Sequence, residues 1–170
     1  MPTTTAVNLL QSLQVVFDEL THGSAADAGW VLNPKDPGLL PSLDRLSSGQ
    51  ASAIPANGGA SIAAHVDHLR YGLELLNRWN RGEEPFATAD FSASWKRTTV
   101  SDREWSERRA ALAREIEGWR NALKNPRDPN DATAQNGIVG SVAHLAYHLG
   151  AIRQIDRAAR GPADQGPIAK

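Results

Sequence analysis

The amino-acid sequence predicts an all-α fold, a four-helix bundle with long crossover connections. In four separate segments, apolar residues recur at steps of three and four, which is the period of a helix that buries one face. No segment shows the two-residue alternation that is typical of a half-buried strand. The segments between these stripes are long and rich in glycine, proline and serine, which favours connections over further regular structure.

The first two helices are predicted from their apolar stripes. The first covers about residues 5–21 and ends before Gly23, because glycine commonly follows a helix C-terminus. Its stripe consists of Leu9, Leu10, Leu13, Val16, Phe17 and Leu20. The second covers about residues 60–81, with Gly82 after its last turn. Its stripe consists of Ile62, Val66, Leu69, Leu73 and Leu76.

The third and fourth helices have clearer end signals. The third opens with a capping box at Ser101 and Glu104, and it ends near Pro126 because the residue before a proline is disfavoured in the helical conformation. Its stripe consists of Trp105, Leu112, Ile116, Trp119 and Leu123. The fourth covers about residues 136–160 and is followed by glycine and proline. Its stripe consists of Ile138, Val142, Leu145, Leu149 and Ile152.

Two connections between these helices are long. The first covers about residues 23–59, with a short helical turn expected at residues 39–46, and a connection of that length is usually functional or crosses the bundle. The second covers residues 83–100, and its aromatic residues predict that it packs on the bundle. The 170 residues are expected to form a single domain, 1–170, whose core is large enough to fold without a metal or disulfide.

The composition excludes several classes of function. The chain has no cysteine, which removes thiol nucleophiles, thiolate metal ligands and disulfides. Its 18 Lys and Arg residues are balanced by 19 Asp and Glu residues, so we expect no nucleic-acid partner. The N-terminus lacks a basic start followed by an apolar core, and no apolar run reaches the ~18–20 residues of a bilayer span. We therefore expect a cytoplasmic protein without a membrane partner.

Two histidines one helical turn apart, His144 and His148, lie in the predicted fourth helix. Residues four apart share a helix face with Cβ atoms roughly 5–6 Å apart, so both imidazoles can bind one metal ion. A third imidazole would complete a site, and the second helix offers His65 and His68. Three imidazoles suit a divalent ion such as zinc or nickel and leave coordination positions open, as catalytic sites do. Spacing alone leaves open which of the two is the third ligand.

These histidines and their surroundings resemble the DinB-like (DinB/YfiT-like) superfamily of metal-binding four-helix bundles, which includes YfiT-like hydrolases and bacterial thiol S-transferases. Residues 144–153 are similar to the family's closing motif, usually His-x-x-x-His-x-Gly-Gln-Ile. Residues 68–71, followed by Gly82, resemble the stretch that carries the remaining ligand. The resemblance covers nearly the whole chain in the order of its elements.

The resemblance assigns the metal ligands. It implies that the ion is held by three histidines, namely His68, His144 and His148. His65 stays the alternative, as a residue that replaces or supports His68. The chain departs from the family pattern at Ala151, where many relatives have glutamine, so no role for that amide is carried over.

The resemblance also implies a range of functions. The expected enzyme is a metal-dependent hydrolase or thiol S-transferase that activates water or a thiol and acts on a small molecule, with a low-molecular-weight thiol as one candidate substrate. The alternatives are a non-catalytic metal-binding or stress-associated dimeric bundle, and a bundle without metal whose histidines line a pocket. A homodimer is carried over from the family as an expectation.

No residue is assigned a catalytic role, but position makes four side chains candidates for orienting the ligands or the substrate. These are Asp67, Tyr71, Tyr147 and Arg153. Because protons compete with metal for imidazole, an ordinary histidine pKa predicts that metal occupancy falls below about pH 6. The metal-free protein is expected to remain helical, since its core does not depend on the ion.

Overall fold

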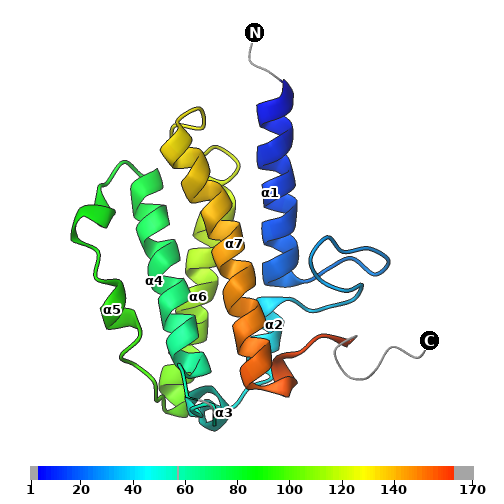
Figure 1. Ribbon diagram of the computed structural model, residues 1–170, viewed down its shortest axis with the longest axis vertical. Coiled ribbons are helices and arrows are strands. Elements are labelled where there is room, and N and C mark those ends of the chain that lie inside the picture. Colours follow the sequence, from blue (N-terminus) through cyan, green and yellow to red (C-terminus); the bar gives the residue numbers. More distant parts are fainter. Residues whose placement is uncertain (1–3, 57, 163–170) are drawn as a thin grey trace.

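The structure is a computed structural model that describes residues 4–56 and 58–162, with side chains from residue 9 onward. Four long helices run alongside one another (Figure 1): α1 (Thr4–His22), α4 (Ile62–Asn80), α6 (Asp102–Ala122) and α7 (Ala132–Ile155). No strand forms within the described ranges. The predicted all-α bundle is therefore confirmed, and each long helix lies on a segment whose apolar stripe predicts it.

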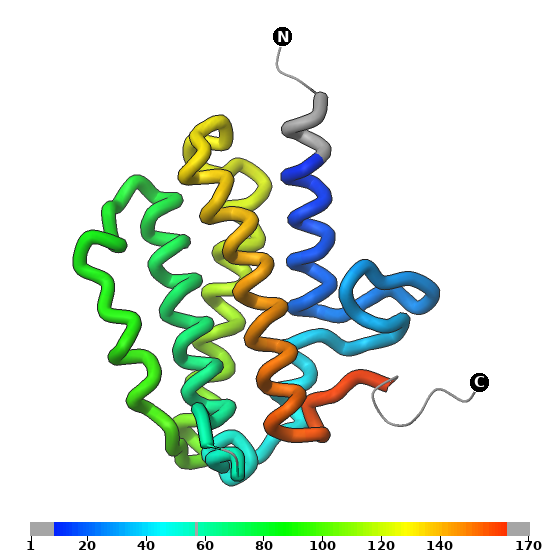
Figure 2. The backbone as a smooth tube through the Cα atoms, viewed as in Figure 1, coloured from blue at the N-terminus to red at the C-terminus, as the bar shows by residue number. Residues whose placement is uncertain are grey.

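Short helices interrupt both long connections. The first connection contains α2 (Leu39–Asp44), close to the predicted turn, and α3 (Ser48–Ser52), which was not predicted. Helix α3 begins with its own capping box between Ser47 and Gln50. The second connection contains the 3₁₀ helix η1 (Pro85–Thr88) and α5 (Phe91–Ser94). Figure 2 shows this segment following the outer side of α4, and α4 contacts both η1 and α5, so the predicted packing on the bundle is confirmed.

Helices α4 and α6 form the most extensive contact, while α7 packs against both α1 and α4. The largest side chains in the core include Trp119 on α6, which is fully buried. Its indole Nε1 donates a hydrogen bond of 2.9 Å to the Ser141 hydroxyl on α7, so the one polar atom of this ring has a partner. Helix α7 thus lies between α1 and α4, which places its histidines beside those of α4.

Capping residues account for the helix ends. The Ser101–Glu104 capping box is present at the start of α6, with the Ser101 N–H donating to the Glu104 carboxylate at 2.8 Å. Helix α7 begins at residue 132, before the predicted residue 136, because the Asp131 carboxylate accepts the Ala134 N–H at 2.9 Å. It ends at residue 155 because Asp156 adopts an extended conformation and caps the 3₁₀ helix η2 (Arg157–Ala159). The predicted extension of α7 to residue 160 is wrong.

A buried carboxylate, that of Glu19, holds the connection between α1 and α2 in place. Glu19 on α1 is 6% exposed and accepts backbone N–H groups of residues 30, 31 and 32 at 2.8, 2.8 and 2.6 Å. Gly38, at the start of α2, has φ 74°, and a Cβ there would lie 2.5 Å from the backbone N of Gly23. Glycine is required at this close contact, since any other residue would clash and be strained.

No helix in the described part of the chain combines the length and apolarity of a membrane span.

Candidate metal centre

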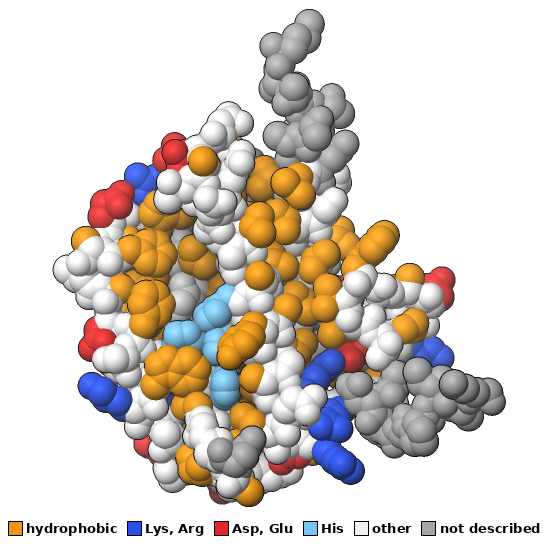
Figure 3. Space-filling view, viewed as in Figure 1, with side chains coloured by type: hydrophobic (Ala, Val, Ile, Leu, Met, Phe, Trp, Pro, Cys, Tyr) orange, Lys and Arg blue, Asp and Glu red, His pale blue; other side chains and the backbone are white. Residues whose placement is uncertain are grey.

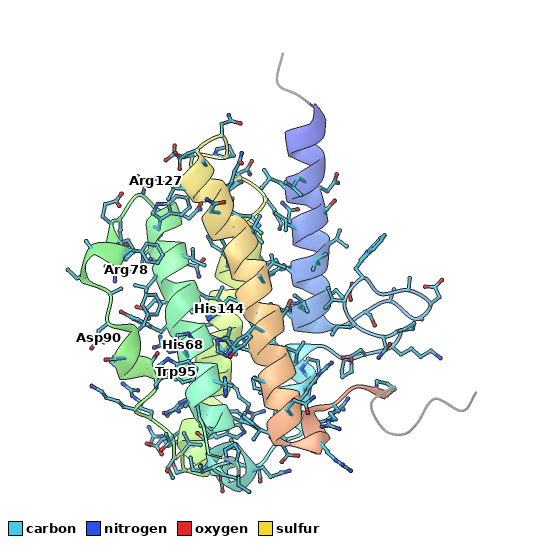
Figure 4. The ribbon with its side chains drawn as sticks, in the orientation of Figure 1. His68, Arg78, Asp90, Trp95, Arg127 and His144 are labelled. Atoms are coloured by element: carbon cyan, nitrogen blue, oxygen red, sulfur yellow. The ribbon has the colours of Figure 1, made fainter. Side chains whose placement is uncertain are left out.

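Helices α4 and α7 bring three imidazoles together, with His68 on α4 and His144 and His148 on α7. The Nε2 atom of His144 lies 3.1 Å from Nε2 of His68 and 2.9 Å from Nε2 of His148. One ligand atom from each ring lies within 4.8 Å of the other two. In Figure 4 the labelled His68 and His144 side chains point toward each other between the two helices.

The spacing of the nitrogens fits a shared divalent ion. Metal–nitrogen bonds of about 2.0–2.1 Å place two ligand nitrogens roughly 2.9 Å apart at a right angle and about 3.4 Å apart at a tetrahedral angle. The two separations from Nε2 of His144, 2.9 and 3.1 Å, lie in this range, and the ligand atoms of His68 and His148 lie within 4.8 Å of each other. Hydrogen bonds alone explain this arrangement less well than a shared ion does. A neutral ring nitrogen has either one N–H or one lone pair, whereas Nε2 of His144 lies close to two other ring nitrogens.

The second nitrogen of two of these rings has a partner that can orient it. In the tautomer that frees Nε2 for a metal, Nδ1 of His68 donates to the Ser94 hydroxyl at 3.0 Å. Ser94 in turn donates to the Phe91 carbonyl at 2.7 Å. Nδ1 of His148 lies 2.8 Å from Nδ1 of His65, which can accept its proton. His65 therefore contacts a ligand of the candidate site and is not one of the three converging rings.

Trp95, which follows α5, covers the histidines from the side of the second connection. Its ring stacks on His68 with centroids 4.3 Å apart and planes inclined by 25°. It also meets the ring of His65 edge-on at 5.3 Å. The aromatic residues of this segment predicted its packing on the bundle, but they did not identify Ser94 or Trp95 as neighbours of the site. The cluster of aromatic residues was the only feature of the sequence that indicated that this segment lies against the bundle.

Burial keeps the imidazoles neutral. Desolvation, with smaller effects of the charges on His144 and His65, lowers the pKa of His68 to about 4. Desolvation and the charges on His144, His65 and His68 lower the pKa of His148 to about 3. Burial lowers the pKa of His65 and of His144 as well. Since neutral imidazole is the form that binds metal, these rings need not release a proton to bind an ion at neutral pH.

The two candidate orienting residues on α4 have partners elsewhere. Asp67 is buried, and its carboxylate pairs with Arg70 at 3.0 Å. The Tyr71 hydroxyl accepts the backbone N–H of Asp90 at 3.1 Å. The expectation that these groups hold the histidine rings is therefore not supported by their hydrogen bonds.

The two candidates on α7 also lack a polar contact with the ligands. Tyr147 is 69% exposed and meets the His148 ring edge-on at 5.0 Å. Arg153 forms a bidentate ion pair with Asp36, which lies in the first connection. A guanidinium held in that way is not available for a substrate carboxylate at the histidines.

Two cavities flank the candidate site. One, of about 300 Å³, extends along α4 and α7 from His144. The other, of about 730 Å³, lies beside His65, Trp95 and Tyr147. In Figure 3 the histidine side chains reach the surface on one face of the molecule, surrounded by hydrophobic side chains. A small molecule can therefore approach His144 through the first cavity and His65 through the second.

A comparison with protein-family models adds an independent finding. The model described as the DinB superfamily matches residues 38–152, a range that contains all three converging histidines, His65 and the second connection. No curated protein and no solved structure matches the chain.

Proposed function

The chain belongs to the DinB superfamily, and on that premise we propose that it is a metal-dependent hydrolase or thiol S-transferase. In this proposal His68, His144 and His148 hold one zinc or nickel ion. The observation that carries the proposal is the convergence of three Nε2 atoms from two helices, with separations of 2.9 and 3.1 Å around His144. Three protein ligands are typical of catalytic zinc sites, which keep a position for water or substrate.

A divalent ion bound here would lower the pKa of a coordinating water or thiol. The deprotonated water or thiol is a strong nucleophile near neutral pH. Side chains of the protein orient the histidine rings and shape the access to the open coordination position. Ser94 and His65 fix the rings of His68 and His148 through their Nδ1 atoms. Trp95 stacks on His68 and limits the access of water from its side. Because the chain has no cysteine, any thiol that reacts here comes from a small-molecule substrate.

The proposal is tested with full-length protein purified without a His tag. We expect about one zinc or nickel ion per chain by elemental analysis, and turnover of an activated ester or of a thiol plus an aryl halide. Turnover should disappear after treatment with a chelator and return when the metal is restored. A bound ion without turnover would favour the non-catalytic metal-binding alternative. A protein that binds no zinc or nickel would contradict the metal site itself.

Metal retention is expected to persist to a lower pH than ordinary histidines allow. Burial lowers the pKa of all three rings, that of His68 to about 4 and that of His148 to about 3, so protons compete with the ion only below the ordinary histidine range. We expect the ion to be retained at about pH 5.5 and released as the pH approaches 4. Dialysis at a series of pH values, followed by elemental analysis and circular dichroism, measures this. Half-release at about pH 6 or above would contradict the lowered pKa values.

The same groups make the metal-free protein less stable in acid. In the unfolded chain a histidine has a pKa near 6.5, whereas the folded-state pKa of His68 and His148 is lower. As the pH falls from about 6.5 toward 4, the unfolded state therefore binds protons that the folded state does not, and the free energy of unfolding falls. The stabilisation is fully present above about pH 6.5. Urea unfolding of the parent and of His148→Gln should show a smaller pH dependence in the variant.

His65 is expected to support the site and not to bind the ion. Its Nδ1 lies 2.8 Å from Nδ1 of His148, so His65→Ala removes the acceptor that orients this ligand. Loss of such a partner typically lowers metal affinity by about 10–100-fold. Competition with a chromophoric chelator measures the affinity, and His65→Gln, which keeps an acceptor oxygen, should recover part of it. If His65→Ala has unchanged affinity, His65 has no supporting role.

A further inference from the structure

The cavity of about 300 Å³ that starts at His144 lies between α4 and α7. Its lining combines leucines, three glycines and two phenylalanines with one serine and one histidine: Leu69, Gly72, Leu73, Leu76, Phe86, Phe91, Gly137, Gly140, Ser141, His144 and Leu145. It therefore joins an apolar space to a ring of the candidate metal centre. Figure 3 shows hydrophobic side chains next to the histidines on this face.

The polar side chains of this lining are not free to bind a polar ligand, apart from His144. The Ser141 hydroxyl accepts the Trp119 Nε1–H at 2.9 Å and donates to the Ile138 carbonyl at 2.7 Å. Its donor and one acceptor position are therefore used inside the bundle. His144 places its Nε2 toward the other two rings. A ligand that fills this cavity must present an apolar group to it.

Three helical glycines keep the cavity open. A Cβ on Gly137 or Gly140 would meet no atom within 4 Å, and a Cβ on Gly72 would first meet Cε1 of His144 at 3.8 Å. These glycines are thus not required by close packing of the two helices. Glycine is the least favourable residue in a helix interior apart from proline, yet here its effect is to leave space beside His144.

We propose that this cavity binds the apolar group of the substrate, an aliphatic chain or a single aromatic ring, while the substrate's reacting group lies at the three histidines. The inference rests on the proposed metal-dependent function. The volume is about twice that of the ~150 Å³ cavity that accepts benzene in an engineered protein. Phe86 and Phe91 line the cavity and are 46% and 41% exposed, so they offer aromatic surface to an entering apolar group.

A series of n-alkyl hydroxamic acids tests the proposal with zinc-loaded, full-length protein. The hydroxamate binds the ion, and each added methylene should tighten binding by about fourfold until the cavity is full. Gly140→Leu fills the cavity and should remove this increment while metal stoichiometry and helical content stay unchanged. Gly150→Leu is the matched control, because Gly150 lies on the same helix and does not line the cavity, and a Cβ there would also meet no atom within 4 Å.

The outcomes separate this proposal from the metal site. If short and long hydroxamates bind equally to the parent, the apolar cavity is not a substrate site although the metal is present. If the protein holds no metal, toluene is the probe, and its binding to the parent but not to Gly140→Leu, seen by NMR shifts, still supports the cavity. If the protein holds no metal and toluene does not bind to the parent either, the proposal is overturned. The length series uses the parent protein, so it remains decisive if Gly140→Leu does not fold.

Discussion

Replacing Asp36 with alanine is expected to lower the free energy of unfolding by about 3–5 kcal/mol, because it leaves a buried cation without its partner. Asp36 is 2% exposed and Arg153 is 8% exposed. The two guanidinium Nη atoms of Arg153 donate to the two carboxylate oxygens at 2.9 and 2.6 Å. Nε of Arg153 is buried without a hydrogen-bond partner among the described residues. The Asp36 carboxylate is therefore the main group that offsets the cost of burying the guanidinium charge.

The ion pair also connects the first long connection to α7. The Asp36 carboxylate accepts the Gly38 N–H at 2.9 Å, just before α2 begins. Arg153 lies in the last turn of α7, on the same helix as the two converging histidines. Loss of Asp36 should therefore loosen the end of α7 as well as the connection.

Urea unfolding measures the effect of Asp36→Ala, with two comparisons. Glu83→Ala removes an exposed pair with Arg78 and should cost less than about 1 kcal/mol. The double replacement Asp36→Leu with Arg153→Met removes both charges and should cost less than Asp36→Ala alone, since a buried pair can often be replaced by apolar residues. Equal losses for Asp36→Ala and Glu83→Ala would show that the buried pair is not important for stability.

The long helices could be predicted because their information is local. The stripe of residues 60–81 needs only the helical period, and α4 forms at Ile62–Asn80. The start of α7 could not be read in this way, because its first turn has no large apolar residue and the Asp131 cap lies in a segment rich in turn residues. Its end was hidden because residues 156–160 keep a helical composition, whereas Asp156 leaves the helical conformation.

The candidate site was predictable to the extent that it depends on spacing within one helix. His144 and His148 share a face because they are four residues apart, and the Nε2 atoms meet as expected. The choice between His65 and His68 depends on how α4 is rotated against α7, which no local pattern determines. Both rings face α7, and they contact different nitrogens: His68 approaches His144, while His65 approaches Nδ1 of His148.

Contacts with irregular segments were beyond prediction. Ser94 reaches His68 from a connection 26 residues away, and its position depends on the packing of α5 on α4. Arg153 was a candidate for the substrate because it lies shortly after the histidines in sequence. Its true partner, Asp36, is 117 residues away and is placed by the path of the first connection. Spacing within one helix therefore predicted that His144 and His148 share a face, but it did not predict the contacts that support the candidate site.

Replacing His148 with alanine is expected to lower the affinity for zinc or nickel by more than about 100-fold, a larger loss than removal of a supporting residue causes. His148 is 2% exposed and is central to the cluster, with Nε2 at 2.9 Å from His144 and Nδ1 at 2.8 Å from His65. Its removal takes away one of the three proposed ligands and also the hydrogen-bond partner of His65. His68→Ala and His144→Ala should reduce the affinity to a similar extent, because each offers one of the three converging nitrogens.

The comparison with His65→Ala and His22→Ala makes this prediction specific. His22 lies at the end of α1, and its Nδ1 contacts the Thr21 hydroxyl at 2.8 Å, so His22→Ala should leave metal affinity unchanged. His65→Ala should fall between this control and the three ligand variants. Chelator competition gives the affinities, and circular dichroism of each metal-free variant shows whether the bundle remains helical. If His68→Ala retains full affinity while His65→Ala loses the ion, then His65 is the third ligand and the assignment of His68 is wrong.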